Sequence, residues 1–65
     1  MKKLLQSKRH EFNLTQAELA DVLAVSEHYV YLIEAGLRKP SVSLAKRIGE
    51  VLHLDWTLFY EENAS

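Results

Sequence analysis

The sequence predicts an all-α domain of five short helices. Helix-favouring residues dominate the chain, and no segment has the alternating apolar pattern of a strand. The only proline is Pro40 and the only glycines are Gly36 and Gly49, so few positions interrupt a helix. A third observation is a boundary signal that recurs along the chain, in which apolar residues flank a helix-capping residue. We therefore expect helices over about 2–12, 15–23, 26–35, 41–52 and 55–61.

Three of the predicted helices begin with a hydrophobic staple and a matching cap, and the last of the three begins at Asp55. Thr15 and Glu18 have the spacing of a capping box, and Ser26 is an N-cap candidate for the next helix. The staple pairs, one residue before the cap and one in the first turn, are Leu14 with Leu19, Val25 with Val30, and Leu54 with Phe59. Asn13 and Gly36 suit the left-handed conformation that ends a helix. These signals predict compact corners rather than one long helix.

Length and composition limit the class of protein. The 65 residues are enough for one domain, over 1–65, whose core is small and benefits from further burial between subunits. Cysteine is absent, which excludes disulfides and cysteine-based zinc sites. After the basic start the chain has no apolar run of signal-peptide or membrane-spanning length. We expect a cytoplasmic protein with no cofactor and no membrane contact.

The charge is nearly balanced overall but unevenly distributed. The net charge is −1, from 8 basic and 9 acidic residues, whereas nucleic-acid binding favours a basic footprint. Residues 1–10 and 36–47 carry basic side chains without acids, and residues 50–65 carry acids without bases. A polarised chain can present a positive face despite its net charge, but ordinary solvated charges explain the same pattern. We expect the acidic end at Tyr60, Glu61 and Glu62 to be a solvated terminus.

The second and third helices meet at a tight corner, because only residues 23–25 join them. This geometry is typical of a helix-turn-helix, although small helical bundles that bind no DNA contain similar corners. A helix turns by about 100° per residue, so the third helix buries Val30 and Ile33 together. On the same helical projection His28, Tyr31 and Leu32 face outward.

The flanks of that helix carry Glu27 and Tyr29. In a major groove His28 can exchange hydrogen bonds with base edges, Leu32 can contact a thymine methyl, and Glu27 can accept from cytosine. The alternative is that Tyr29 and Tyr31, with Leu32, pack on neighbouring helices or on another protein, because aromatic patches also mark protein interfaces.

The combined motifs resemble a known family. The stretch LTQAELADVLAVSEHYVYLIEAGLRKPS, residues 14–41, is similar to the Cro- and phage-repressor-type helix-turn-helix family, also called the xenobiotic-response-element family. The segment VSLAKRIGEVLHLDWTLFY continues the resemblance, which covers about residues 5–60. The resemblance implies the fold of lambda-repressor-like DNA-binding domains. It also implies a transcriptional regulator, typically a repressor that binds double-stranded palindromic DNA as a homodimer.

The resemblance also assigns roles to individual residues. The positions that match DNA contacts are Thr15, Gln16, Ser26, Glu27, His28, Tyr29, Tyr31, Leu32, Arg38 and Lys39. Among these, Gln16 is expected to contact a phosphate and to brace the third helix. Arg9 and Glu34 match a pair that forms a partly buried salt bridge between the first and third helices. Family dimers often join through the region that holds Leu54, Trp56 and Phe59.

The sequence departs from the family pattern at three places. Ala24 and His53 stand where glycine is frequent; His53 is interpreted as a helix cap rather than a ligand. The outward face of the third helix lacks arginine, lysine, asparagine and glutamine, which are the strongest base readers. This face favours an alternative function, a protein-interaction module on the same scaffold, such as an antirepressor or an antitoxin, with a regulatory protein as its partner.

An enzyme is not expected. The three histidines, His10, His28 and His53, do not have the spacing of metal ligands. The chain also lacks a nucleophile motif and a glycine-rich phosphate loop.

Overall fold

The computed structural model describes residues 2–60, with side chains from residue 4 onward, and this part of the chain is all-helical as predicted. Its elements are α1 (Lys2–Glu11), α2 (Gln16–Leu23), α3 (Glu27–Glu34), α4 (Val42–Leu52) and the 3-10 helix η1 (Trp56–Tyr60). The predicted ranges were slightly too long because they included the capping residues. The fifth element is a short 3-10 turn rather than an α-helix, and the predicted end at residue 61 lies outside the described residues, as do Glu61 and Glu62.

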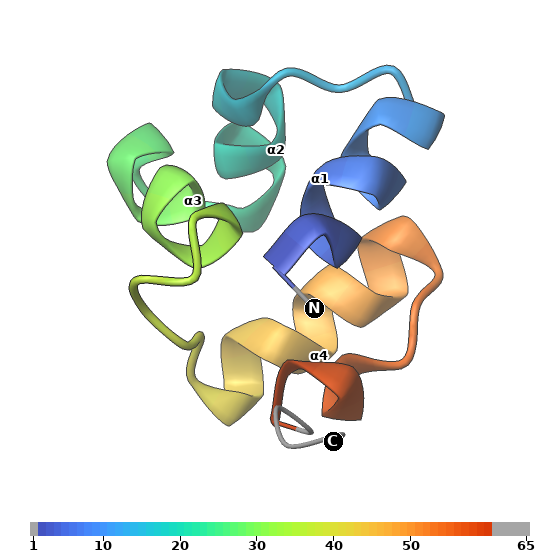
Figure 1. The fold of residues 1–65 in the computed structure, drawn as a ribbon. Helices are drawn as coiled ribbons and strands as arrows, with labels where there is room; N and C mark the ends of the chain where they lie inside the picture. Colours follow the sequence, from blue (N-terminus) through green and yellow to red (C-terminus); the bar gives the residue numbers. More distant parts are fainter. Residues whose placement is uncertain (1, 61–65) are drawn as a thin grey trace.

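Figure 1 shows how the helices are arranged. α2 and α3 form a corner on one side of the molecule, α1 lies beside them, and α4 crosses the opposite end with η1 next to it. α3 packs against both α2 and α1, and its remaining surface lies at the edge of the molecule. Within residues 2–60 no helix combines the length and the apolar character needed to cross a membrane.

One three-residue corner occurs three times in the chain. Each corner has a residue with left-handed backbone, then an apolar residue, then the cap of the next helix. The three corners are Asn13-Leu14-Thr15, Ala24-Val25-Ser26 and His53-Leu54-Asp55. In each corner the backbone N–H of the apolar residue donates to a carbonyl of the helix that has just ended. The distances are 3.0 Å from Leu14 to the Arg9 carbonyl, 3.0 Å from Val25 to the Ala20 carbonyl and 3.1 Å from Leu54 to the Gly49 carbonyl.

These backbone bonds are those of the Schellman helix ending, in which a left-handed residue lets the next N–H reach a free carbonyl. The φ angles are 57° at Asn13, 61° at Ala24 and 56° at His53, so the predicted cap role of His53 is confirmed. The apolar residue of each corner then packs against the core, where the staples predicted it. Each corner therefore ends one helix and orients the next.

The end of α3 has the same bonding but a different outcome. Gly36 is left-handed, with φ 78°, and Leu37 N–H bonds to the Leu32 carbonyl at 2.9 Å. Here no helix follows at once, and Leu37 is 69% exposed instead of packed on the core. The segment from Gly36 to Pro40 thus leaves α3 as a loop on the surface.

The core forms where the four α-helices face each other. Its buried members are Leu5, Leu19, Ala20, Leu23, Val30, Ile33, Leu44, Ile48 and Leu52. Val30 and Ile33 are the inward residues predicted for α3. Half-buried Leu54 and Phe59 pack against this core from the C-terminal side, which closes it below α4.

Gly49 allows the C-terminal segment to lie directly against α4. A β-carbon at Gly49 would stand 2.7 Å from the Leu54 carbonyl oxygen and 3.3 Å from Cβ of Trp56. The absence of a side chain at this position therefore positions η1 on α4. The Lys46 ammonium, 5.3 Å from the centre of the Trp56 ring, adds a cation–π contact across the same junction.

Candidate nucleic-acid interface

α3 is fixed to the body of the protein by a buried ion pair. Nε of Arg9 lies 2.6 Å from Oε2 of Glu34, and its Nη2 lies 3.1 Å from Oε1, so the contact is bidentate. The side chains are only 8% and 7% exposed. Arg9 also donates to the Leu14 carbonyl at 2.8 Å, which ties α1, the following corner and α3 together. The structure thus contains the pair that the resemblance implied.

Gln16 joins this network from the first turn of α2. Its side-chain amide donates to Oε1 of Glu34 at 3.0 Å. The Glu34 carboxylate therefore accepts hydrogen bonds from both α1 and α2. This contact holds α3 across α2, which is the bracing expected of Gln16. Its amide carries a second N–H for which the structure gives no protein acceptor among the described residues.

The starts of α2 and α3 are capped as predicted. Thr15 Oγ1 accepts from the Glu18 N–H at 3.0 Å, and Glu18 Oε1 accepts from the Thr15 N–H at 2.9 Å, which completes the capping box. Ser26 Oγ accepts from the Tyr29 N–H at 3.1 Å. An open hollow of about 660 Å³ lies beside these starts, lined by Arg9, His10, Asn13, Leu14, Thr15, Gln16 and Glu27. The capping oxygens are thus already engaged, and the hollow is lined mainly by polar groups.

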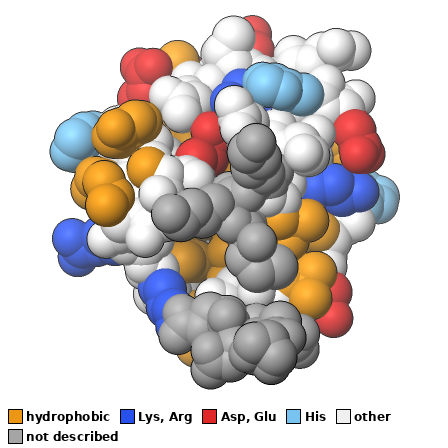
Figure 2. Space-filling model, viewed as in Figure 1, with side chains coloured by type: hydrophobic (Ala, Val, Ile, Leu, Met, Phe, Trp, Pro, Cys, Tyr) orange, Lys and Arg blue, Asp and Glu red, His pale blue; other side chains and the backbone are white. Residues whose placement is uncertain are grey.

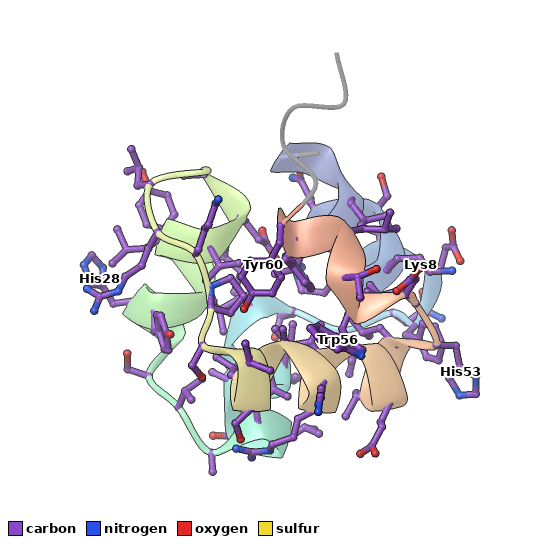
Figure 3. The ribbon with its side chains drawn as sticks, turned by 90° about the horizontal axis from the view of Figure 1, so that it is seen from below. Lys8, His28, His53, Trp56 and Tyr60 are labelled. Atoms are coloured by element: carbon purple, nitrogen blue, oxygen red, sulfur yellow. The ribbon has the colours of Figure 1, made fainter. Side chains whose placement is uncertain are left out.

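The outward side of α3 carries the expected aromatic and polar residues. Glu27, His28 and Tyr31 are exposed, with Tyr31 at 48%. The rings of His28 and Tyr31 are stacked with centres 6.1 Å apart. Figure 2 shows apolar side chains beside a histidine at the edge where α3 lies, with basic side chains below them, and Figure 3 shows His28 extending away from the body. We call the exposed outer side of α3, formed by Glu27, His28 and Tyr31, the ridge. The helix itself carries no lysine or arginine.

Leu32 corrects one detail of the sequence prediction. The helical projection placed it directly outward, but its side chain is half-buried. It lines a second hollow, of about 390 Å³, together with Ser26, His28, Tyr29 and Arg38. Arg38 of the following loop lines the same hollow, and a projection of the helix alone does not include this loop. Leu37, which the sequence analysis did not single out, is instead the most exposed of the large apolar residues in the described part.

Arg38 and Lys39 lie exposed on the loop next to α3, as expected for backbone-contacting residues. The Arg38 guanidinium stands 5.7 Å from the centre of the Tyr29 ring, a cation–π contact that connects the loop to α3. Tyr29 itself is half-buried and packs against the core. The loop cations therefore lie beside the α3 ridge and supply the positive charge that the ridge lacks.

Other basic side chains have structural partners. Arg47 donates to the Leu23 carbonyl at the end of α2, so it closes the helix that precedes the turn. Lys8 lies 3.4 Å from Glu11 on the surface of α1. Some of the basic residues thus stabilise the fold, and no pattern in the sequence separates them from Arg38.

Leu54, Trp56 and Phe59, expected at a dimer surface, are all half-buried. Leu54 and Phe59 pack against the core, whereas Trp56 lies on α4 with Tyr60 edge-on to its ring at 6.1 Å. Asp55 directly precedes the 3-10 helix, and its carboxylate accepts from the Thr57 hydroxyl at 2.7 Å and from the Thr57 N–H at 3.0 Å. These bonds, the hydroxyl first, lower the pKa of Asp55 below its ordinary value of 3.8.

No cluster of metal-ligating side chains occurs among residues 4–60. The α2–α3 region combines a helix fixed by a buried ion pair, an exposed outer side of that helix, two capped helix starts and an adjacent loop with two cations.

Comparison with known proteins agrees with this arrangement. The helix-turn-helix family matches residues 5–59. A Bacillus subtilis (strain 168) protein, the HTH-type transcriptional regulator YqaF, is 45% identical over 62 residues, covering 95% of this chain and 82% of its own length. An HTH-type transcriptional regulator of Methanothermobacter thermautotrophicus (strain Delta H) is 32% identical over 68 residues, covering 100% of this chain and 99% of its own. No solved structure matches the chain significantly.

The fold and the α2–α3 corner define a helix-turn-helix protein. The chain belongs to the helix-turn-helix family, and its relatives are transcriptional regulators, so it is a DNA-binding regulator.

Proposed function

We propose that the chain is a sequence-specific transcriptional repressor that binds a palindromic operator as a homodimer, with α3 in the major groove. The observation that carries this proposal is the contrast between the two sides of α3. Its inner side is fixed by the buried Arg9–Glu34 pair, while its outer side is an exposed ridge. A rigidly held helix with a free face is the arrangement that reads base edges in this class of motif.

The contacts divide into two kinds. Arg38 and Lys39 beside the ridge, and the free amide N–H of Gln16, bind the phosphate backbone of double-stranded DNA and fix the register of the protein. Thr15 and Ser26 lie at helix starts, whose N–H groups and dipole favour phosphate oxygens. Glu27, His28, Tyr31 and Leu32 read the bases, and Tyr29 supports the adjacent loop.

The side chains on the ridge indicate which bases α3 prefers. Without arginine or lysine on α3 the helix lacks the usual guanine contacts, whereas Tyr31 and Leu32 offer apolar surface that suits a thymine methyl group. Glu27 can accept from the cytosine amino group. We therefore expect operators whose contacted positions include thymine, and replacing these thymines by uracil, which removes only the methyl group, weakens binding.

Dimerisation follows from size and from the C-terminal segment. A small core gains stability from burial between subunits, and half-buried Trp56, together with the edges of Leu54 and Phe59, supplies an aromatic and aliphatic contact surface. Two copies of α3 then read half-sites about 34–36 Å apart. Occupying such a site blocks other proteins from the same DNA, which is repression. We place this activity in the cytoplasm, with the DNA.

Selection of binding sites from random duplex DNA tests the proposal. The expected result is enrichment of an inverted repeat, bound about 10³-fold or more tightly than unrelated DNA. His28→Ala and Leu32→Ala then lower the preference for the selected site, whereas Arg38→Ala weakens all sequences alike and flattens the salt dependence. Failure to enrich any inverted repeat at low salt contradicts the proposal, and equal loss of preference in all three variants contradicts the division of contacts.

A second candidate, a protein-interaction module such as an antirepressor or antitoxin, is favoured by one observation. Tyr31 and Leu37 expose apolar surface close to an α3 face without cations. Protein interfaces prefer such surfaces. The same selection discriminates the two functions, because a module that binds only protein enriches no DNA sequence.

A further inference from the structure

A contact between η1 and the loop after α3 has no role in the functions considered above. The hydroxyl of Tyr60 donates to the carbonyl of Pro40 at 2.5 Å. Tyr60 is the last described residue of η1, and Pro40 directly follows the two exposed cations of the loop, Arg38 and Lys39. Figure 3 shows Tyr60 between η1 and this loop.

The loop is held at three points. Its start is fixed by the helix ending at Gly36 and the bond from Leu37 N–H to the Leu32 carbonyl. Its middle is held by Arg38, which lies over the ring of Tyr29. Its end is held at Pro40, which is buried and which has no N–H of its own to bond with neighbours.

Tyr60, which bonds to Pro40, is itself held by contacts with Trp56 and α4. The ring of Tyr60 lies edge-on to the ring of Trp56 at 6.1 Å. Trp56 in turn lies against Gly49 of α4, close enough that a β-carbon there would stand 3.3 Å from its own. The hydroxyl of Tyr60 is thus positioned by α4 through Trp56.

We propose that Tyr60 is a positioning residue for DNA binding, whose hydroxyl holds the loop so that Arg38 and Lys39 are presented to the phosphate backbone beside α3. This inference rests on the proposed function. Cations held in place lose less conformational freedom on binding than cations on a free loop, so the bond contributes to affinity without touching DNA. The residues of η1 proposed for the dimer surface share this element, which links the dimer contact to the DNA-binding loop.

The test is Tyr60→Phe, which removes the hydroxyl and keeps the ring on Trp56. Dissociation constants are measured by fluorescence anisotropy for a selected operator and for an unrelated duplex, over a series of salt concentrations. We expect both constants to rise by the same factor, about 3- to 10-fold, which is the range that one hydrogen bond supports. The salt dependence becomes flatter because fewer phosphate contacts are fixed, while the specificity ratio is unchanged.

Thr57→Val is the matched control, because it removes a hydroxyl hydrogen bond from the same 3-10 helix without contact to the loop. It should leave DNA affinity unchanged. A combined variant supplies a second readout: in an Arg38→Ala background the effect of Tyr60→Phe shrinks, because the cation that it positions is gone. A purely structural role predicts the same loss in both backgrounds.

Identical DNA-binding curves for the wild-type protein and Tyr60→Phe overturn the inference. An equal loss of DNA affinity in Thr57→Val also overturns it. A wild-type protein that binds neither duplex overturns the proposed function as well, so the two failures are distinguishable within one series.

Discussion

Replacing Arg9 by methionine is expected to remove most of the stability of the fold. The substitution deletes the bidentate contact to Glu34, with distances of 2.6 and 3.1 Å, and the 2.8 Å bond to the Leu14 carbonyl. The Glu34 side chain is only 7% exposed, so its carboxylate stays out of water, with the Gln16 amide as the hydrogen-bond donor that remains among the described residues. The penalty is therefore that of an uncompensated buried charge and not that of a surface pair.

The expected loss of stability in Arg9→Met is a large part of the free energy of unfolding of the whole domain. Removing one partner of a buried ion pair costs about 3–5 kcal/mol. A domain of 65 residues has a free energy of unfolding of roughly 3–10 kcal/mol at the usual value per residue. The double variant Arg9→Met, Glu34→Met leaves no buried charge, so we expect it to be more stable than Arg9→Met alone by about 1 kcal/mol or more.

Urea unfolding followed by far-ultraviolet circular dichroism measures these differences, because the helices report the transition. Lys8→Met is the matched control: it breaks an exposed pair to Glu11 on the same helix and should change stability by less than about 1 kcal/mol. A loss of unfolding free energy in Arg9→Met no larger than that in Lys8→Met would contradict the buried-charge penalty. A double variant less stable than Arg9→Met would also contradict it, because the penalty then does not arise from the buried charge.

Three further predictions concern the corners and the C-terminal segment, each checked by the free energy of unfolding. Ala24→Gly relieves the left-handed strain at φ 61° and stabilises by about 0.5–1 kcal/mol, net of the greater freedom of glycine when unfolded; no gain contradicts this. Gly49→Ala destabilises by about 1–3 kcal/mol because its β-carbon stands 2.7 Å from the Leu54 carbonyl, and a stabilised variant would mean that η1 moves away freely. The pKa of Asp55 is lowered, chiefly by Thr57, so its contribution is present above the ordinary value of 3.8 and is lost as pH falls through the lowered value. The stability difference between wild type and Asp55→Ala should therefore shrink in acid, and a difference independent of pH contradicts the bond.

Local signals in the sequence were sufficient for the corners. Asn13, Gly36 and His53 were predicted to end helices, and all have positive φ angles. Thr15 and Ser26 were predicted as caps, and both accept the expected N–H. These features depend on residues within five positions of each other, so the backbone geometry follows from residue type and spacing.

Contacts between distant segments were not available from such signals. The bonds from Gln16 to Glu34, from Arg47 to Leu23 and from Tyr60 to Pro40 each join residues at least 18 positions apart. The Arg9–Glu34 pair and the bracing of α3 by Gln16 were anticipated, but the family resemblance rather than spacing supplied both. Helical periodicity placed Leu32 directly outward, whereas it is half-buried and lines a hollow with Arg38 of the following loop, whose path periodicity does not predict.

The central claim is that the exposed ridge of α3 reads a DNA sequence. Its most direct test compares the dissociation constant for the selected operator with that for a scrambled duplex at one salt concentration, for wild type and for the double variant His28→Ala, Tyr31→Ala. We expect a ratio of about 10³ or more for wild type, and a much smaller ratio for the variant with unchanged affinity for the scrambled duplex. A ratio near one for wild type, or a ratio that the variant leaves intact, would contradict it.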